Sequence, residues 1–190
     1  MAGLRRRYRT SEVSFVLRQS GAVACFVLPE NRGASLWEMA REASAELAEA
    51  PLLVPIGEGR DGAPGWEKWL AAGDAVGEDR LERRRRAVRP ADTSQIQFTS
   101  GTTGFPKGAE LSHGGIVNNA RLFAHRATFP PHGRHSNPMP YFHCGGCVMS
   151  TLGSVATGSA QMPAITFDPA RITRTIEEEG CTSLSAVPTM

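Results

Sequence analysis

The sequence contains no long hydrophobic run. Its longest uninterrupted apolar stretch is Ala22 to Leu28, whereas a membrane-spanning helix needs about 20 apolar residues. The basic N-terminal stretch, residues 1–10, has no apolar region behind it and therefore lacks the pattern of a secretory signal. The sequence thus predicts no transmembrane segment and a cytoplasmic location.

Cysteine is scarce, and charge of neither sign dominates. Four cysteines in 190 residues do not make the disulfide framework of a small secreted protein, and they favour a reducing compartment. The 21 basic and 19 acidic side chains leave a formal net charge of +2, which by itself indicates neither a nucleic-acid partner nor a membrane surface. A hydrophobic share of 41% and a charged share of 21% are ordinary for a soluble globular domain.

A strongly basic run, Arg83 to Arg86, lies within a segment that is expected to be helical, residues 78–88. Such runs occur in nucleic-acid-binding proteins, but no aromatic residue is interleaved here to stack on a base. Glu78, Asp79 and Glu82 are close by in the sequence and offset part of the positive charge. We therefore predict an exposed, solvated helix rather than a nucleic-acid site.

Apolar residues in the first half of the chain recur with two different periods. The spacing i, i+3, i+4, as at Val13, Val16 and Leu17, predicts helices, and short apolar runs rich in β-branched residues predict buried strands. The expected elements are a helix capped by Thr10 or Ser11 and ended by Gly21, a strand over 22–28, a helix capped by Ser35 over 36–48, and a strand over 52–56. Strand, helix and strand in this order favour a parallel sheet.

The rest of the chain continues this alternation. Clusters of Gly, Asp and Pro predict loops, and Ser112 and Asp168 carry side chains that cap helices. The expected elements are loops over 57–65 and 128–137, helices over 66–72, 78–88, 113–126, 145–156 and 169–180, and strands over 109–112, 159–162 and 182–187. The predicted fold class is therefore α/β, with mostly parallel sheets flanked by helices.

One glycine- and hydroxyl-rich stretch points directly to chemistry. It reads Thr99-Ser100-Gly101-Thr102-Thr103-Gly104-Phe105-Pro106-Lys107-Gly108. The glycines allow backbone N–H groups to approach a ligand closely. The hydroxyls donate hydrogen bonds and the lysine supplies a positive charge, which together suit phosphate oxygens. The stretch therefore predicts a phosphate-binding loop.

This loop differs from the Walker type, in which a helix follows the Gly-Lys-Ser/Thr sequence. Pro106 precedes Lys107 and disfavours helical geometry at Phe105. Residues 95–98 ahead of the loop and 109–112 behind it have strand patterns. We therefore predict a strand–loop–strand unit that binds anions with amides and hydroxyls rather than with a helix dipole.

The stretch resembles the phosphate-binding signature of the adenylate-forming superfamily, which includes acyl-CoA synthetases, luciferases and the adenylation domains of peptide synthetases. A flexible Gly/Ser/Thr surface loop would not require Pro-Lys-Gly at its end. The residues to which the resemblance gives ATP-binding roles are Thr99, Ser100, Gly101, Thr102, Thr103, Gly104, Lys107 and Gly108. In this interpretation the loop holds the β- and γ-phosphates while a carboxylate attacks the α-phosphorus.

A second chemically distinctive stretch is His143-Cys144-Gly145-Gly146-Cys147. Its C-x-x-C pair, with His132 and His135 nearby in the sequence, is compatible with a zinc site or a redox dithiol. However, a single C-x-x-C is a weak signal, and a redox pair normally opens a helix in a thioredoxin-like unit. Two small apolar side chains flanking a glycine turn are the simpler interpretation, and we predict no metal site.

The resemblance gives the same stretch another role. Pro140-Tyr141-Phe142-His143, followed by Cys144-Gly145-Gly146, resembles the family's aromatic-His segment, which lines the acyl pocket of acyl- and aryl-CoA synthetases. This implies that Phe142 and His143 line the substrate pocket, with His143 as a catalytic residue near the carboxylate to be activated. It also implies that Gly145 or Gly146 leaves space for the acyl group.

The resemblance extends from about Tyr8 to Met190. A third segment, Ser185 to Met190, resembles a Val-Pro-Thr segment of the family, with Ala186 in place of the more usual glycine. The aromatic-His segment is most similar to that of fatty-acyl and related carboxylate–CoA ligases. Such enzymes use ATP and Mg²⁺ to form an acyl-adenylate and release pyrophosphate, and then transfer the acyl group to CoA. The implied partners are a small carboxylic acid, ATP and CoA, with no nucleic acid.

Family members are much longer than 190 residues. Their Tyr-Gly-x-Thr-Glu segment with a magnesium-binding glutamate, their ribose-binding aspartate and their C-terminal lid domain have no match here. We therefore expect residues 1–190 to be a central part of the large N-terminal domain, incomplete at both ends and inactive alone, with the Mg²⁺ ligands outside it. The alternatives are a non-catalytic nucleotide-binding module and a zinc or thiol protein that uses Cys144 and Cys147.

Overall fold

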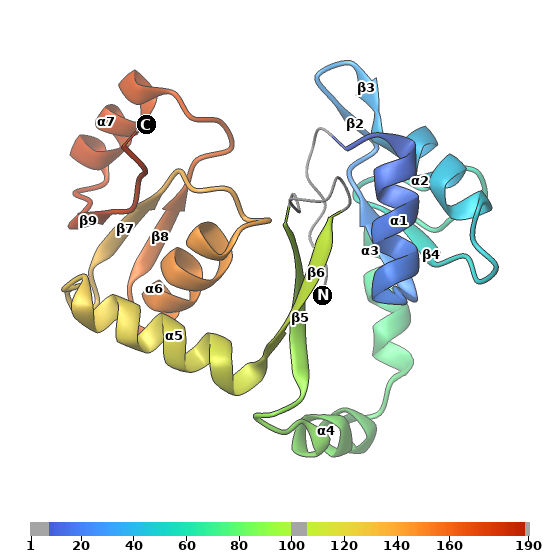
Figure 1. Ribbon diagram of the computed structural model, residues 1–190, viewed down its shortest axis with the longest axis horizontal. Helices are drawn as coiled ribbons and strands as arrows, with labels where there is room; N and C mark the ends of the chain where they lie inside the picture. Colours follow the sequence, from blue (N-terminus) through green and yellow to red (C-terminus); the bar gives the residue numbers. More distant parts are fainter. Residues whose placement is uncertain (1–7, 100–105, 189–190) are drawn as a thin grey trace. The chain divides into compact units, whose positions relative to one another are not determined.

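The computed structural model describes residues 8–99 and 106–188, which divide into two compact units. The first unit comprises residues up to 89 together with 98–109, and the second comprises residues 90–97 together with those from 110 onward. Both units combine helices with short strands, and the strand pairs β1–β4, β7–β8 and β7–β9 are parallel (Figure 1). The α/β class with mostly parallel sheets is therefore confirmed.

The first unit is built on a parallel strand pair covered by two helices. Its elements are α1 (Thr10–Ser20), β1 (Ala24–Val27), β2 (Glu30–Asn31), β3 (Ala34–Ser35), α2 (Leu36–Ala45), β4 (Leu52–Pro55), α3 (Trp66–Ala71), a 3₁₀ turn (Ala72–Ala75) and α4 (Glu78–Ala87). Strands β1 and β4 pair in register Cys25↔Leu53. The strand–helix–strand order predicted from the sequence therefore gives the expected parallel pair.

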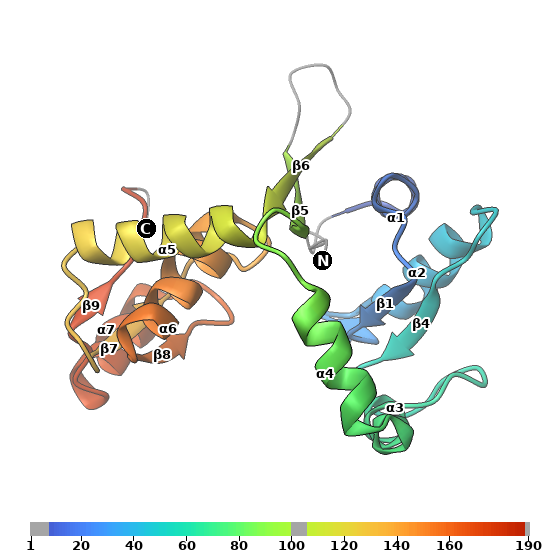
Figure 2. The same ribbon diagram turned by 90° about the horizontal axis from the view of Figure 1, so that it is seen from below.

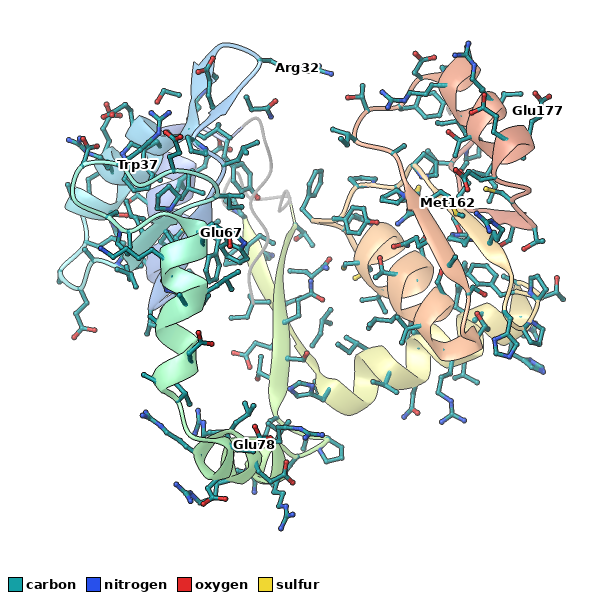
Figure 3. All side chains as sticks on the ribbon, turned by 180° about the vertical axis from the view of Figure 1, so that it is seen from behind. Arg32, Trp37, Glu67, Glu78, Met162 and Glu177 are labelled. Atoms are coloured by element: carbon teal, nitrogen blue, oxygen red, sulfur yellow. The ribbon has the colours of Figure 1, made fainter. Side chains whose placement is uncertain are left out.

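The core of this unit lies where α1 and α2 pack on β1. Val13 and Leu17 of α1 are buried there with Cys25 of β1, as the apolar spacing of α1 predicts. Trp37 of α2 is the largest fully buried side chain of the described residues (Figure 3). Ala40 and Ala43 of the same helix are buried beside it in this core.

The caps of the helices were predicted with one error. Ser35 accepts a hydrogen bond from the Glu38 amide, as expected, and Gly21 ends α1 in the left-handed region with φ +60°. Neither Thr10 nor Ser11 caps α1, however, because the helix already begins at Thr10 and Arg9 takes the cap position. There the Glu12 carboxylate accepts the Arg9 amide at 2.7 Å, which is one of the two hydrogen bonds of a capping box.

Two tight hairpins in this unit follow from residues in the left-handed region. Strands β2 and β3 are joined by Arg32 and Gly33, with φ +52° and +77°. The bridge between Arg60 and Ala63 is closed by Asp61 and Gly62, with φ +49° and +81°. Positive φ at both central residues is the geometry of a type I′ turn. The first hairpin was not predicted, because arginine is not a residue that indicates this turn.

Aromatic rings connect β1 to α3. Trp66 and Trp69 stack with ring centroids 5.7 Å apart, and Phe26 meets both edge-on at 5.6 and 4.9 Å.

The helix α4 that follows has no buried residue, and Glu82 pairs with Arg85 at 3.0 Å and with Arg86 at 2.7 Å. The predicted exposed, charge-offset helix is therefore confirmed.

The second unit has a three-stranded parallel sheet in the order β8-β7-β9. Its elements are α5 (His113–Arg126), β7 (Arg134–Asn137), the π-helix η2 (Gly145–Leu152), α6 (Gly153–Thr157), β8 (Ala160–Pro163), α7 (Pro169–Glu178) and β9 (Ser183–Leu184). Helix α5 packs against η2 and α6 (Figure 1). Ser112 and Asp168 cap α5 and α7 as predicted, since their side chains accept the Gly115 amide and the Ala170 and Arg171 amides.

The central strand of this sheet was wrongly predicted to be a loop. The segment Arg134–Asn137 has no apolar residue, yet it forms β7 between two neighbouring strands, and His135, Ser136 and Asn137 are all buried. Their polar atoms have partners inside the fold: His135 Nδ1 lies 2.9 Å from Ser183 Oγ, and Asn137 Oδ1 accepts the Met139 amide at 3.1 Å. Periodicity of apolar residues does not detect a strand that is buried in this way.

Strands β5 (Thr93–Thr99) and β6 (Lys107–Ser112) form a separate two-stranded sheet and lie side by side (Figures 1 and 2). Across the pair, Thr93 Oγ1 donates to Glu110 Oε2 at 2.9 Å. This confirms the prediction that strands, rather than a helix, flank the glycine-rich stretch. Among the described residues, no helix combines the length and the apolar character required to cross a membrane.

Candidate functional site

The predicted phosphate-binding loop begins at the end of β5 and finishes at the start of β6. Thr99 is the last residue of β5, and Lys107 and Gly108 are the first two of β6. All three are exposed. Ser100, Gly101, Thr102, Thr103 and Gly104, which complete the predicted ATP-binding set, lie outside the described residues.

The ends of the two strands present groups that suit a phosphate. The Lys107 ammonium is a compact point charge on a flexible stem, and Gly108 next to it places no side chain against an approaching ligand. A short connection between two paired strands also differs from the strand-to-helix turn of Walker loops. The described part of the loop is therefore compatible with anion binding from a strand end.

The second predicted site segment is a tight turn between β7 and η2. The His143 carbonyl accepts the amides of Gly146 at 3.0 Å and of Cys147 at 3.1 Å, so the turn leads directly into the helix. The Gly145 amide donates to His143 Nδ1 at 3.0 Å. Because this nitrogen is an acceptor, the neutral ring carries its proton on Nε2. His143 itself is exposed, so Nε2–H is the ring group that can donate to a ligand.

Hydrogen bonds to two strands hold this turn. Asn137, at the end of β7, donates from Nδ2 to the Gly146 carbonyl at 3.4 Å and accepts the Met139 amide. Tyr141 Oη donates to Gln161 Oε1 of β8 at 3.0 Å. The turn is thus attached to the neighbouring parallel strands β7 and β8, which are rigid supports for a site. Phe142, the other predicted pocket residue, is half-buried.

Close backbone contacts require a glycine at position 146, whereas the nearest atom to a Cβ at position 145 belongs to a side chain. A Cβ at Gly146 would lie 2.4 Å from the Pro140 carbonyl oxygen and 2.7 Å from that of Met139. A Cβ at Gly145 would lie 2.7 Å from Met139 Cε. The backbone of the turn therefore lies against Gly146, and the end of the Met139 side chain lies against Gly145.

The two cysteines of the turn contact glutamine side chains of β5. Gln97 Nε2 donates to Cys147 Sγ at 3.0 Å, and Cys144 Sγ donates to Gln97 Oε1 at 3.2 Å. Burial, with a contribution from the nearby Cys147, raises the pKa of the Cys144 thiol. The sequence analysis missed these glutamines, because β5 was identified only by its alternation of apolar residues.

The zinc hypothesis required His132 and His135 to join the cysteine pair. His135 instead lies in β7, with Nδ1 next to Ser183 Oγ and its ring 4.4 Å from that of Phe129. Burial lowers the pKa of this imidazole. Within residues 8–99 and 106–188, no group of three or more His, Cys, Asp or Glu side chains is arranged to hold a metal ion.

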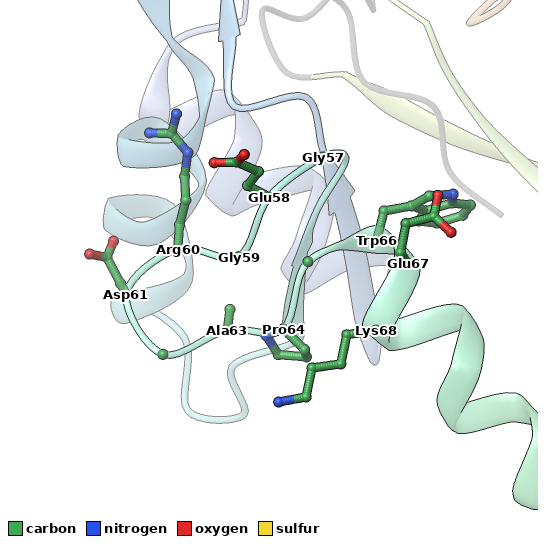
Figure 4. A pocket seen from close by; sticks show the side chains of 12 residues that line it. Gly57, Glu58, Gly59, Arg60, Asp61, Ala63, Pro64, Trp66, Glu67 and Lys68 are labelled. Atoms are coloured by element: carbon green, nitrogen blue, oxygen red, sulfur yellow. The ribbon is translucent and has the colours of Figure 1, made fainter.

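A hollow in the first unit is lined by residues 57–68 (Figure 4). Its wall is the segment of the Asp61–Gly62 hairpin together with the start of α3. Trp66 stands at one side of the hollow, and the lining also includes the charged residues Arg60, Glu67 and Lys68. Of the described residues, none that is predicted to bind substrate or cofactor lines this hollow.

Comparison with known proteins covers the whole chain. The family model described as AMP-binding enzyme matches residues 1–190. YngI of Bacillus subtilis (strain 168), provisionally named an acyl-CoA synthetase, is 34% identical over 197 residues, which cover 96% of this chain and 36% of YngI. The mitochondrial medium-chain acyl-CoA ligase ACSF2 of Danio rerio is 31% identical over 206 residues, which cover 96% of this chain and 33% of ACSF2.

Solved structures agree on the fold. The anthranilate CoA ligase AuaEII, in a complex with anthranoyl-AMP, superposes with a TM-score of 0.80 over 99% of this chain and 35% of its own, at 20% identity. The chain thus spans about a third of the length of the relatives that it matches.

Proposed function

Because this chain belongs to the AMP-binding enzyme family, we propose that it supplies the phosphate-binding loop and part of the acyl pocket of an ATP-dependent acyl-CoA synthetase. The reaction class is adenylation of a carboxylic acid of the fatty-acyl type, with release of pyrophosphate, followed by transfer of the acyl group to CoA. The observation that supports it most is the loop from Thr99 to Gly108, supported by the paired strands β5 and β6.

The proposed work of the loop is positioning and charge neutralisation. Lys107, at the start of β6, places its ammonium on the β- and γ-phosphates of ATP, and the loop hydroxyls and amides bind the remaining oxygens. Holding these groups leaves the α-phosphorus accessible to the carboxylate, and it stabilises the pyrophosphate as it leaves. The set proposed for this task is Thr99, Ser100, Gly101, Thr102, Thr103, Gly104, Lys107 and Gly108.

The proposed work of the turn after β7 is recognition of the acid. His143 presents Nε2–H because Nδ1 accepts the Gly145 amide. An N–H donor beside a carboxylate orients it by a hydrogen bond. Phe142 supplies apolar contact to the acyl group, and Gly145 and Gly146 allow the tight path of the backbone beside it.

Magnesium and CoA complete the proposed reaction. Mg²⁺ would neutralise phosphate charge, and we place its protein ligands outside residues 1–190, in the part of the relatives that this chain does not span. The same holds for the contacts to adenosine, for the lid domain that relatives carry and for the CoA site. We also propose that the complete protein works in the cytoplasm.

Acid-dependent exchange of pyrophosphate into ATP tests the proposal. We compare the 190-residue chain with a chimaera in which it replaces the matching segment of the Danio rerio medium-chain ligase. The isolated chain is expected to give no exchange, because the adenosine and magnesium contacts are missing. The chimaera is expected to exchange pyrophosphate when octanoate is added.

Two results would contradict the proposal. One is robust exchange by the isolated chain, which would show that the missing contacts are not needed. The other is a chimaera that unfolds cooperatively and binds MgATP but gives no exchange with any carboxylic acid while the parent ligase does. That second result would favour a non-catalytic nucleotide-binding module.

A further inference from the structure

Two glutamine side chains lie on the buried side of β5. Gln95 and Gln97 are only 6% and 9% exposed, and as alternate residues of a strand they point to the same face. A buried carboxamide without partners costs about 1–3 kcal/mol. A strand that only fills a core is therefore expected to carry apolar residues at these positions. The hydrogen-bond partners of the two carboxamides indicate why glutamine is present instead.

The partners of both amides are the thiols of the His143 turn. Cys147 Sγ accepts from Gln97 Nε2 at 3.0 Å and from Gln95 Nε2 at 3.4 Å. Cys144 Sγ donates to Gln97 Oε1 at 3.2 Å. The two glutamines thus bind the turn at two points, namely Cys144, which follows His143 directly, and Cys147, four residues after His143.

The sulfur of Cys147 continues this connection to His143. It donates to the His143 carbonyl oxygen at 3.2 Å, and the Cys147 amide donates to the same oxygen at 3.1 Å. A series of hydrogen bonds therefore runs from the Gln97 carboxamide through the Cys147 thiol to the His143 backbone. The Gly145 amide then fixes the imidazole through Nδ1.

We propose that Gln97 and Cys147 are positioning residues for the adenylation proposed above, and that they hold the His143 turn to the strand that continues into the phosphate-binding loop. Gln97 precedes Thr99 by two residues in β5, so any displacement of the loop strand is transmitted to the turn through these bonds. The role of these residues in adenylation rests on the proposed function. The hydrogen bonds between Gln97, Cys147 and His143 are observed independently of it.

Gln97→Met tests the connection in the 190-residue chain, because it keeps the side-chain length and removes the carboxamide. Gln19→Met, at an exposed position of α1, is the matched control. On the sulfur side, Cys147→Ala removes the bridge, and Cys147→Ser retains a hydroxyl that can accept from Gln97 and donate to the carbonyl. Cys181→Ala controls for loss of a thiol elsewhere.

The readout is the ring tautomer of His143 in long-range ¹H–¹⁵N spectra, with its signals assigned by the loss that accompanies His143→Gln. The wild-type chain is expected to show the Nε2–H tautomer. Gln97→Met and Cys147→Ala are expected to give a mixture of tautomers, while Cys147→Ser, Gln19→Met and Cys181→Ala retain the wild-type pattern. A role confined to packing would change the melting temperature without changing the tautomer.

Unchanged His143 signals in both Gln97→Met and Cys147→Ala would overturn the proposal, and so would an equal change in Gln19→Met. If Gln97→Met does not fold, the comparison of Cys147→Ala with Cys147→Ser decides alone, and equal spectra for these two variants would overturn the proposal. The proposed function fails by a different result, namely a chimaera that folds and binds MgATP but gives no exchange with any carboxylic acid, which these spectra do not measure.

Discussion

The indole Nε1 of Trp37 donates a hydrogen bond of 2.7 Å to Oδ2 of Asp61. This bond connects the largest buried side chain of α2 to the turn of the 60–63 hairpin, and Arg41 donates to the same oxygen at 3.0 Å. The Trp37 hydrogen bond, followed by that of Arg41, holds the pKa of Asp61 below its usual value.

The first prediction concerns acid stability. A carboxyl group whose pKa is lower in the folded state stabilises the protein above its unfolded pKa of about 3.9, and loses that contribution as pH falls through the folded value. Asp61→Asn should therefore lower the melting temperature at pH 7 and weaken its decrease between pH 5 and pH 2. Asp74→Asn, at an exposed aspartate of the 3₁₀ turn, is the control, and a matching change there would contradict the assignment.

The second prediction concerns His135, which is fully buried in the central strand of the second unit and whose Nε2 has no hydrogen-bond partner among the described residues. Since burial lowers its pKa, the unfolded chain binds a proton more readily than the folded one. Stability should therefore decrease as pH falls below about 6.5, the ordinary histidine value, and level off below the folded pKa.

Urea unfolding of His135→Gln between pH 8 and pH 5 measures this effect. The variant should lose the decrease in stability over that range, and the exposed His125→Gln should retain it. A wild-type stability that does not change between these pH values would show that the His135 assignment is wrong.

The third prediction concerns the turn that carries His143. Gly146→Ala would place a Cβ 2.4 Å from the Pro140 carbonyl oxygen, which is backbone and cannot rotate away. Overpacking of this kind costs about 1–3 kcal/mol. Gly73→Ala has open space around it, so it should be neutral or slightly stabilising. Equal urea midpoints for the two variants would be incompatible with the tight turn.

Much of this fold could be predicted from single residues with a defined local role. Ser35, Ser112 and Asp168 cap their helices as expected, because a side-chain oxygen beside unpaired amides acts over only three residues. The parallel pairing of β1 with β4 followed from the order of the elements. These rules are local or topological, so a sequence contains them completely.

The errors of the sequence-based prediction arose where contacts between residues far apart in the sequence determine the structure. Strand β7 consists of polar residues that are buried because β8 and β9 flank it, and no residue in its own sequence indicates those neighbours. The glutamines of β5 contact cysteines that lie 47 to 52 residues away in the sequence. Sequence motifs located His143 and Cys147, but only the fold showed what holds them.

Exchange of pyrophosphate into ATP by loop variants of the chimaera with the Danio rerio ligase tests the central claim most directly. Lys107→Ala and Thr102→Ala are expected to reduce octanoate-dependent exchange by at least about tenfold, since each removes a group proposed to hold the phosphates. Lys68→Ala, the other lysine of the chain, is the control and should leave the rate unchanged. Exchange that is equally fast in Lys107→Ala, Thr102→Ala and the unsubstituted chimaera would contradict the assignment of residues 99–108 as the phosphate-binding loop.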